Sequence, residues 1–299
     1  MRRHTVDLML LTTVLLWALN FTVTKYVITH GFRPLAYSGV RYGCAAFLFA
    51  GITYLRERSL AIRLRDVPLL IVPAVFFLLL NQFGYVYSVK FTTAATVSLI
   101  IGSTPVFVAI FALAIGLERL PLAFWLSAAA SFAGVGLVAA GGSGGLSGDL
   151  KGDLLAVCTA ATWAAYSIAI TPLMRRYSPW RISAVVLLAT WVGLIVAGSP
   201  QLAGQSFDFG WLTWAGFAYA VLGPLVTTNV LFFTALDRVG PSRASLFANL
   251  QPFFGVIFAL LLLSEHMSAI QVVGGVAIGI GIVLERRLRP AAVEVPPGE

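Results

Sequence analysis

Apolar residues fill ten long stretches of the chain, and short connections rich in Gly, Pro and Arg separate them. An α-helix crosses the hydrocarbon core of a bilayer in about 20 residues, and the stretches approach that length. They cover residues 8–28, 34–55, 67–88, 93–114, 121–141, 151–173, 180–199, 211–236, 242–263 and 268–285. The pattern predicts an all-α integral membrane protein with ten transmembrane helices. The first stretch is longer than the apolar core of a signal peptide, so we expect it to remain as a membrane helix.

Polar residues inside these stretches recur at helical spacing. In the first stretch, Thr13, Trp17, Asn20 and Thr24 fall on one face of a helix, and related stripes occur in the third, fourth, sixth, eighth and ninth. Polar side chains in lipid tend to face a cavity or another helix, so we expect these six helices to line a central pathway. The candidate substrate-binding residues along it are Trp17, Asn20, Asn81, Gln82, Tyr85, Trp163, Tyr166, Thr228, Asn229, Asn249 and Gln251.

These stripes also have a structural interpretation. Small polar residues occur at helix–helix contacts, and Ser98, Gly102 and Ser245 suit packing as well as they suit substrate contact. Trp17 and Trp163 lie deep in their spans, away from the membrane interface where Trp is common, which favours a functional role for them. Neutral amides, hydroxyls and rings match a substrate with a hydrogen-bonding head and an apolar or aromatic tail.

Two strong charges, Lys25 and Arg41, lie well inside the predicted spans and toward their outer ends. We expect the long side chain of Lys25 to reach the membrane interface. Arg41 is deeper, where either a substrate carboxylate or the carbonyl end of a helix would pair with it.

Pro105 and Pro252 each remove a backbone hydrogen bond within a span. We expect them to act as a hinge or gate, or as static bends that shape the cavity.

The composition agrees with a surface that faces lipid. Of the 299 residues, 59% are hydrophobic and 11% are charged, whereas roughly a quarter of a soluble domain is charged. So few charges could not cover a soluble surface. The formal net charge of +8 comes from basic residues in the connections, so it predicts helix orientation rather than binding of nucleic acid.

The distribution of Lys and Arg sets the expected orientation. With the N-terminus in the cytoplasm, the outer connections hold only Arg33, Lys90 and Lys151. The cytoplasmic side then holds Arg2, Arg3, Arg56, Arg58, Arg63, Arg65, Arg119, Arg175, Arg176, Arg181, Arg238, Arg243, Arg286, Arg287 and Arg289. We therefore expect both termini in the cytoplasm, which an even number of spans requires.

The two halves of the chain repeat each other. A shift of 146 residues places Asp7 on Asp153, Thr13 on Thr159 and Trp17 on Trp163, and a shift of 147 places Ser98 on Ser245, Pro105 on Pro252 and Glu118 on Glu265. Residues 1–148 form the first five-helix repeat with a Gly/Ser linker, and 149–299 form the second with a cytoplasmic tail. Because each repeat has five spans, the halves would cross the membrane in opposite orientations, an arrangement found in secondary transporters.

The sequence contains no motif that is typical of an enzyme active site or a metal site. The chain lacks the GxxxxGK[ST] phosphate loop, its two cysteines are too few for a disulfide framework or a metal site, and no catalytic cluster stands out. We expect no cofactor and no enzymatic activity.

A channel would tolerate a continuous polar pore, but paired inverted halves with aromatic stripes favour a saturable carrier. No acidic residue lies at a helix centre, which disfavours proton-coupled export of cationic drugs.

The ten spans, the two repeats, the paired prolines and the residues Glu118 and Glu265 after the fourth and ninth spans resemble the EamA family of the drug/metabolite transporter superfamily. Within it, the chain is most similar to YddG-type amino acid exporters. The resemblance implies export of amino acids, aromatic ones in particular, across the bacterial inner membrane. Export of small drugs or other metabolites is the alternative.

Small residues near the ends of the fifth and tenth spans permit close packing, within one chain or between two chains. They are Gly134, Gly136, Gly274, Gly275, Gly279 and Gly281. The expected partners are an amino acid substrate and the lipid bilayer, and the expected state is a monomer or a homodimer.

Overall fold

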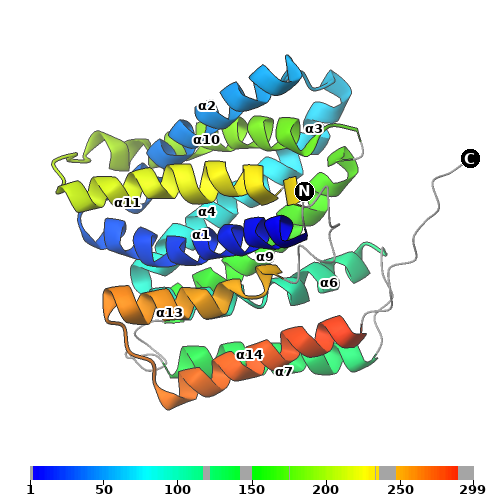
Figure 1. Ribbon diagram of the computed structural model, residues 1–299, viewed down its shortest axis with the longest axis vertical. Helices are drawn as coiled ribbons and strands as arrows, with labels where there is room; N and C mark the ends of the chain where they lie inside the picture. Colours follow the sequence, from blue (N-terminus) through cyan, green and yellow to red (C-terminus); the bar gives the residue numbers. More distant parts are fainter. Residues whose placement is uncertain are drawn as a thin grey trace, which may run out of the picture.

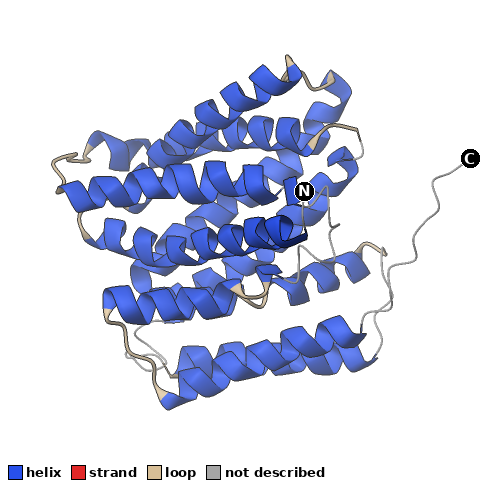
Figure 2. Ribbon diagram, in the orientation of Figure 1, coloured by secondary structure: helices blue, strands red, loops and turns tan. Residues whose placement is uncertain are grey.

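A computed structural model describes residues 3–116, 122–141, 150–174, 176–232, 234–235 and 247–288. Regular structure in these residues is helical throughout, and none of them lies in a strand (Figure 2). The long helices lie side by side as a stack (Figure 1). Many large apolar side chains on the outside of the stack are exposed, such as Leu261 and Val196. Lipid would cover these side chains.

The first half contains the helices that the apolar pattern predicts. Its elements are α1 (Arg3–Thr29), α2 (Pro34–Glu57), the 3-10 turn η1 (Leu64–Asp66), α3 (Val67–Leu70), the π-helical turn η2 (Ile71–Val75), α4 (Phe76–Phe91), α5 (Ala94–Ile101), α6 (Thr104–Ala114) and α7 (Leu122–Ala140). The segment from η1 to α4 is helical throughout and corresponds to the third predicted span.

The second half follows the same order. Its elements are α9 (Leu150–Met174), α10 (Pro179–Ala203), α11 (Trp211–Val221), the π-helical turn η3 (Leu222–Thr227), helical residues 228–232, α13 (Gln251–Leu263) and α14 (Ala269–Leu288). Over both halves, seven described helical segments are long and apolar enough to span a membrane, and three more apolar helices are shorter. The chain is therefore a multi-pass membrane protein, and ten spans remain our prediction.

Several contacts between helices recur when the two halves of the chain are exchanged. The pair formed by α4 and α9 corresponds to the pair formed by α1 and α11, because exchanging the halves converts one pair into the other. The same exchange converts the pair α1 and α13 into the pair α9 and α6. Two pairs join equivalent helices to each other: α2 with α10, and α7 with α14. The contact between α5 and α13 joins the fourth predicted span to the ninth. Packing of this kind is what a two-fold relation between the repeats would produce.

Connections that the charge pattern assigns to one face lie together. On the predicted outer face, the backbone N–H of Arg33 donates to the side-chain oxygen of Gln205 at 2.7 Å. On the predicted cytoplasmic face, Arg181 forms an ion pair with Glu57 at 3.1 Å. Contacts on both faces join the first half to the second, so the predicted alternation of the connections fits the structure.

The glycines of α7 and α14 place two helix backbones in contact within this chain. A Cβ atom on Gly134 would lie 2.6 Å from the carbonyl oxygen of Gly274, and one on Gly281 would lie 2.8 Å from the carbonyl oxygen of Ser127. Neither position has room for a side chain. Gly136 has open space around it. The small residues therefore serve helix packing inside one chain at Gly134, Gly274 and Gly281.

The fourth and ninth predicted spans each contain a two-residue turn, at 102–103 and at 249–250, shortly before a proline. In the first half, α5 ends at Ile101, and Pro105 lies in the first turn of α6. In the second half, residues 249–250 form a turn, and Pro252 lies in the first turn of α13. Proline is compatible with a first helical turn because the N–H groups there have no helical partner. Ser245 and the rest of 236–246 lie outside the described residues.

The two breaks touch each other. The hydroxyl of Ser98 donates to the carbonyl oxygen of Pro252 at 3.0 Å. A Cβ atom on Gly102 would lie 3.1 Å from the Pro252 ring. Ser98 and Gly102 thus serve packing between the halves, as the structural interpretation of the stripe predicted.

Candidate functional site

Arg41 is the centre of a buried polar cluster. It lies in the N-terminal third of α2, and 2% of its surface is exposed. Its guanidinium donates from Nη2 to Gln82 Oε1 at 3.1 Å, and from Nη1 to Asn20 Oδ1 at 3.5 Å and to the Tyr37 hydroxyl at 3.4 Å. These three residues come from α4, α1 and α2, so the cluster joins three helices of the first half.

The partners of Arg41 are neutral. No acidic side chain among the described residues pairs with its guanidinium, and its Nε atom is buried without a hydrogen-bond partner. Two of the three hydrogen bonds are close to the outer limit of length. Burying a cation without an acidic partner is costly, and here only neutral side chains compensate the charge of Arg41.

Aromatic rings enclose the guanidinium. Its central carbon lies 5.0 Å from the ring centroid of Tyr37, 5.6 Å from that of Tyr42 and 5.9 Å from that of Tyr85. Such rings attract a cation through their faces. Two of the three rings belong to α2, a helix that the polar stripes did not single out. Tyr37 and Tyr42 are missing from the predicted site, although Tyr37 lies four residues before Arg41 on the same helix face.

Hydrogen bonds fix the wall of the cluster on α1. The Asn20 side-chain amide donates to the Tyr85 hydroxyl at 2.9 Å, and that hydroxyl donates to Thr24 Oγ1 at 3.1 Å. The Tyr37 hydroxyl lies 3.2 Å from the same Thr24 oxygen. These contacts hold the neutral oxygens that face Arg41, so the site is rigid on this side.

Asn81 and Gln82 connect the cluster to the second half. The Gln82 side-chain amide donates to Asn81 Oδ1 at 2.9 Å, and the Asn81 amide donates to the Thr159 carbonyl oxygen of α9 at 2.9 Å. Both side chains are buried. A displacement of α9 would therefore act on the oxygen that Gln82 presents to Arg41.

Trp17 lies one helical turn from Asn20 and forms a second part of the site. Its indole N–H donates to Thr228 Oγ1 at 2.9 Å, and its ring centroid lies 5.4 Å from that of Phe232. Thr228 donates in turn to the carbonyl oxygen of Pro224, inside the π-helical turn η3. Irregular turns of this kind are frequent at functional sites, and here the turn positions a polar contact beside Trp17.

The remaining predicted residues lie farther from Arg41. Tyr166 packs in the same hydrophobic cluster as Tyr42, and its ring centroid lies 5.5 Å from that of Trp163. Trp163 is 43% exposed, and it does not share the anchored position of Trp17. The Asn229 amide donates to its own helix, at the Leu225 carbonyl, at 2.6 Å.

Asn249 and Gln251 flank the start of α13, and neither side chain has a hydrogen bond to another described residue. The structure does not bring these two side chains into the Arg41 cluster. They correspond to the break in the ninth predicted span, so their place in the pathway stays a prediction.

Lys25 caps the C-terminal end of α4, and its position relative to the membrane interface stays a prediction. Its ammonium group donates to the carbonyl oxygens of Val89 at 2.8 Å and Thr92 at 2.7 Å, at the C-terminal end of α4. A cation stabilises the negative end of a helix.

Glu265 caps a helix of the opposite half. Its carboxylate accepts from the backbone N–H groups of Ala94 at 2.8 Å and Ala95 at 2.9 Å, at the start of α5. An acidic side chain at a helix start complements the exposed N–H groups and the positive helix end. Its repeat counterpart Glu118 lies outside the described residues.

A polar cluster buried among apolar helices, together with two pseudo-equivalent halves, defines a multi-pass membrane transporter. The family model of the EamA-like transporter family matches the chain twice, at residues 4–140 and 150–285. The chain belongs to this family.

The curated relatives extend over nearly the whole chain. An uncharacterized transporter of Archaeoglobus fulgidus is 24% identical over 92% of this chain and 97% of its own length. The uncharacterized transporters YdeK and YyaM of Bacillus subtilis are 24% and 23% identical, over 92% and 95% of this chain and 94% of each relative. A solved crystal structure superposes with a TM-score of 0.63 at 18% identity, covering 96% of this chain and 99% of that one. This likeness shows a shared fold.

Proposed function

We propose that this protein exports neutral and aromatic amino acids across the bacterial inner membrane by alternating access. The observation that carries the proposal is Arg41, a buried guanidinium with neutral partners and an unpartnered Nε. Hydrogen bonds between a guanidinium and a carboxylate are shorter than those between neutral partners, and about twice as strong. The α-carboxylate of an amino acid would therefore displace the long contacts to Asn20 and Tyr37.

The surroundings of Arg41 favour an aromatic or apolar side chain on that substrate. Tyr37, Tyr42 and Tyr85 enclose the guanidinium, and Trp17 packs against Phe232 one helical turn away. Binding sites of this kind combine apolar and aromatic walls with a few placed polar groups. Side-chain oxygens of Asn20 and Gln82 supply acceptors for the α-ammonium group.

The broken helices supply the moving parts in this proposal. α5 in one half and α13 in the other meet where Ser98 contacts Pro252. Transporters commonly place discontinuous helices at corresponding positions of two repeats, beside the substrate site. Rocking one half against the other about this contact would expose the cluster to each face in turn. Pro105 and Pro252 then define the start of the moving helix in each half.

Uptake into proteoliposomes that contain the purified protein tests the proposal. Radiolabelled phenylalanine, tryptophan, threonine and methionine are compared with arginine, a cationic dye and a nucleotide sugar, with and without a pH gradient. We expect saturable uptake of the neutral and aromatic amino acids without a pH gradient. Transport of the dye alone, dependent on a proton gradient, would contradict the proposal and favour drug export. Transport of the nucleotide sugar alone would favour another metabolite.

A further inference from the structure

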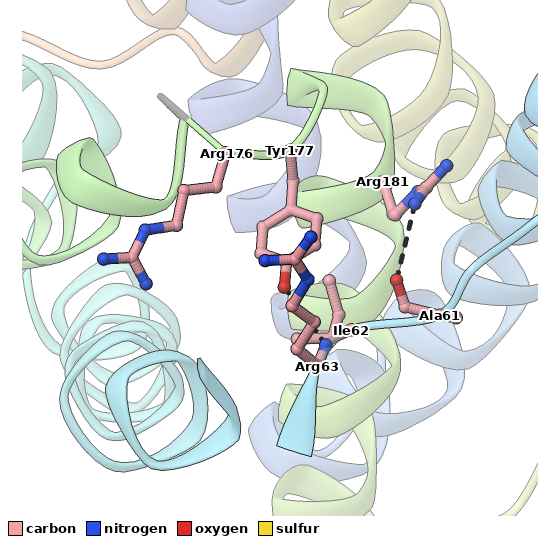
Figure 3. Close-up of a pocket in the computed structure, with 6 residues that line it drawn as sticks. All are labelled: Ala61, Ile62, Arg63, Arg176, Tyr177 and Arg181. Atoms are coloured by element: carbon pink, nitrogen blue, oxygen red, sulfur yellow. Dashed lines mark hydrogen bonds between the residues drawn. The ribbon is translucent and has the colours of Figure 1, made fainter. Parts of the chain in front are cut away.

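A second basic site lies at the face that the charge pattern assigns to the cytoplasm. The connection before α3 and the turn before α10 enclose a hollow of about 510 Å³. It is lined by Ala61, Ile62, Arg63, Arg176, Tyr177 and Arg181 (Figure 3). Three arginines thus line this hollow, and they come from both halves of the chain.

Two of the three arginines are already held in place. Arg176 forms an ion pair with Asp66, and Arg181 forms one with Glu57 at 3.1 Å. The Tyr177 hydroxyl donates to the second oxygen of Asp66 at 2.6 Å. Each carboxylate accepts from only some of the N–H groups of one guanidinium, which has five N–H donors. Arg176 and Arg181 therefore keep donors that an additional anion can use.

Arg63 supplies the uncompensated charge. Its backbone N–H donates to the Tyr177 hydroxyl at 3.1 Å, which fixes the position of the residue. Its guanidinium has no hydrogen bond or ion pair with the other described residues. Figure 3 shows the Arg63 side chain in front of Tyr177, with Arg176 to one side and Arg181 to the other. Three guanidinium groups against two carboxylates leave this site positive.

Neighbouring side chains place the site at the level of the lipid headgroups. Leu64 directly follows Arg63 and is 88% exposed, so its side chain is available to the acyl chains. The Arg56 guanidinium lies 4.4 Å from the ring of Trp180, at the adjoining ends of α2 and α10. Trp and Arg are common at membrane interfaces, and basic pockets between helices on the cytoplasmic side suit anionic headgroups.

We propose that the hollow around Arg63, Arg176 and Arg181 binds the phosphate of an anionic phospholipid headgroup. Arginine matches phosphate geometry and can donate to it in pairs. A hollow of this volume lies in the range that small-molecule groups occupy. Because the arginines belong to both halves, a bound headgroup links the two halves at the cytoplasmic face. The site is separate from the Arg41 cluster, so the proposal stands or falls independently of the transported substrate.

Native mass spectrometry of the purified protein tests the assignment. Wild type is titrated with phosphatidylglycerol, phosphatidylcholine or inorganic phosphate, and compared with Arg63→Gln and Arg65→Gln. Arg65 lies in the same connection and is exposed, but it does not line the hollow, so it is the matched control. We expect Arg63→Gln to weaken phosphatidylglycerol binding about five-fold or more, and Arg65→Gln to leave it close to wild type.

The other two ligands of the titration distinguish the phosphate of a lipid headgroup from free inorganic phosphate. Phosphatidylcholine, which carries no net charge, should bind weakly to all three proteins. Equal retention of phosphatidylglycerol by Arg63→Gln and wild type would overturn the proposal. Binding of inorganic phosphate that is lost in Arg63→Gln, with no preference for phosphatidylglycerol, would replace the lipid with a free anion and overturn the lipid assignment.

Discussion

At the residue scale, Arg41 and Lys25 show how two similar cations in one membrane protein take different roles. Lys25 is satisfied by the carbonyl oxygens of Val89 and Thr92 at a helix end. Arg41 has a buried Nε without a partner and neutral side chains around it. A side chain that serves stability alone would not leave a buried charge so poorly paired. This difference is the basis for our proposal that Arg41 binds the substrate.

Replacing Arg41 with Gln should separate transport from stability. We expect Arg41→Gln to raise the KM for phenylalanine by at least about 30-fold, because losing one partner of a buried hydrogen-bonded charge pair costs about 2–5 kcal/mol. Its thermal unfolding midpoint in detergent should not fall, since the variant removes an unpaired buried charge. Arg33→Gln, at an exposed position just before α2, is the control and should transport as wild type. Normal transport by Arg41→Gln would refute the role of Arg41.

The residues around Arg41 were only partly predictable. The stripe Trp17, Asn20 and Thr24 follows from helical spacing, and the structure places all three in or beside the cluster. Tyr37 and Tyr42 escaped prediction because tyrosines in an apolar stretch resemble membrane packing. The partners of Lys25 lie 64 and 67 residues away in sequence, so no local pattern identifies them.

At the element scale, the breaks at Gly102 and Asn249 distinguish the fourth and ninth spans from the other helices. The apolar pattern predicted both spans but not the interruptions, although Gly102-Ser103-Thr104-Pro105 contained the signal. Pro105 has no N–H to donate to the carbonyl oxygen four residues earlier, at Ile101, and α5 ends at that residue. Hydropathy reports how long an apolar stretch is, and it does not report whether the backbone inside it is continuous.

The contact between the two breaks should be sensitive to one added methyl group. In Gly102→Ala, the new Cβ would lie 2.9 Å from the Leu99 carbonyl oxygen and 3.1 Å from the Pro252 ring. We expect a loss of stability of about 1–3 kcal/mol, as for other overpacked sites, seen as a lower thermal unfolding midpoint. Gly136→Ala in α7 is the matched control, because nothing lies within 4 Å of its added Cβ. Equal midpoints for the two variants would show that the breaks do not pack as described.

At the scale of the whole molecule, the pairing of equivalent helices and the two matches to one family model describe the same duplication. The sequence repeat predicted this duplication because Trp17 and Trp163, or Pro105 and Pro252, recur at a nearly constant offset. The sequence could not reveal that the two tryptophans differ in setting. Trp17 is anchored on Thr228, whereas Trp163 is 43% exposed. That difference arises from tertiary packing.

Cysteine labelling tests the predicted orientation. With Cys44 and Cys158 replaced by Ala, single cysteines are introduced by Ala61→Cys and Ser206→Cys, in connections assigned to opposite faces. A membrane-impermeant maleimide should label the Ser206 variant in intact cells. It should label the Ala61 variant only after the membrane is permeabilised, because the arginine-rich connections are expected to face the cytoplasm. The reverse pattern would invert the topology, and labelling of both in intact cells would contradict the predicted number of spans between them.

Competition for phenylalanine counterflow in proteoliposomes tests the central claim most directly, namely that Arg41 recognises the carboxylate of an amino acid. The competitors are 3-phenylpropionate, which keeps the carboxylate and lacks the amine, and phenethylamine, which keeps the amine and lacks the carboxylate. Recognition through a guanidinium predicts that 3-phenylpropionate inhibits counterflow by wild type and phenethylamine does not. Inhibition by phenethylamine without inhibition by 3-phenylpropionate would show that the site selects a cation, and would contradict the assignment of Arg41.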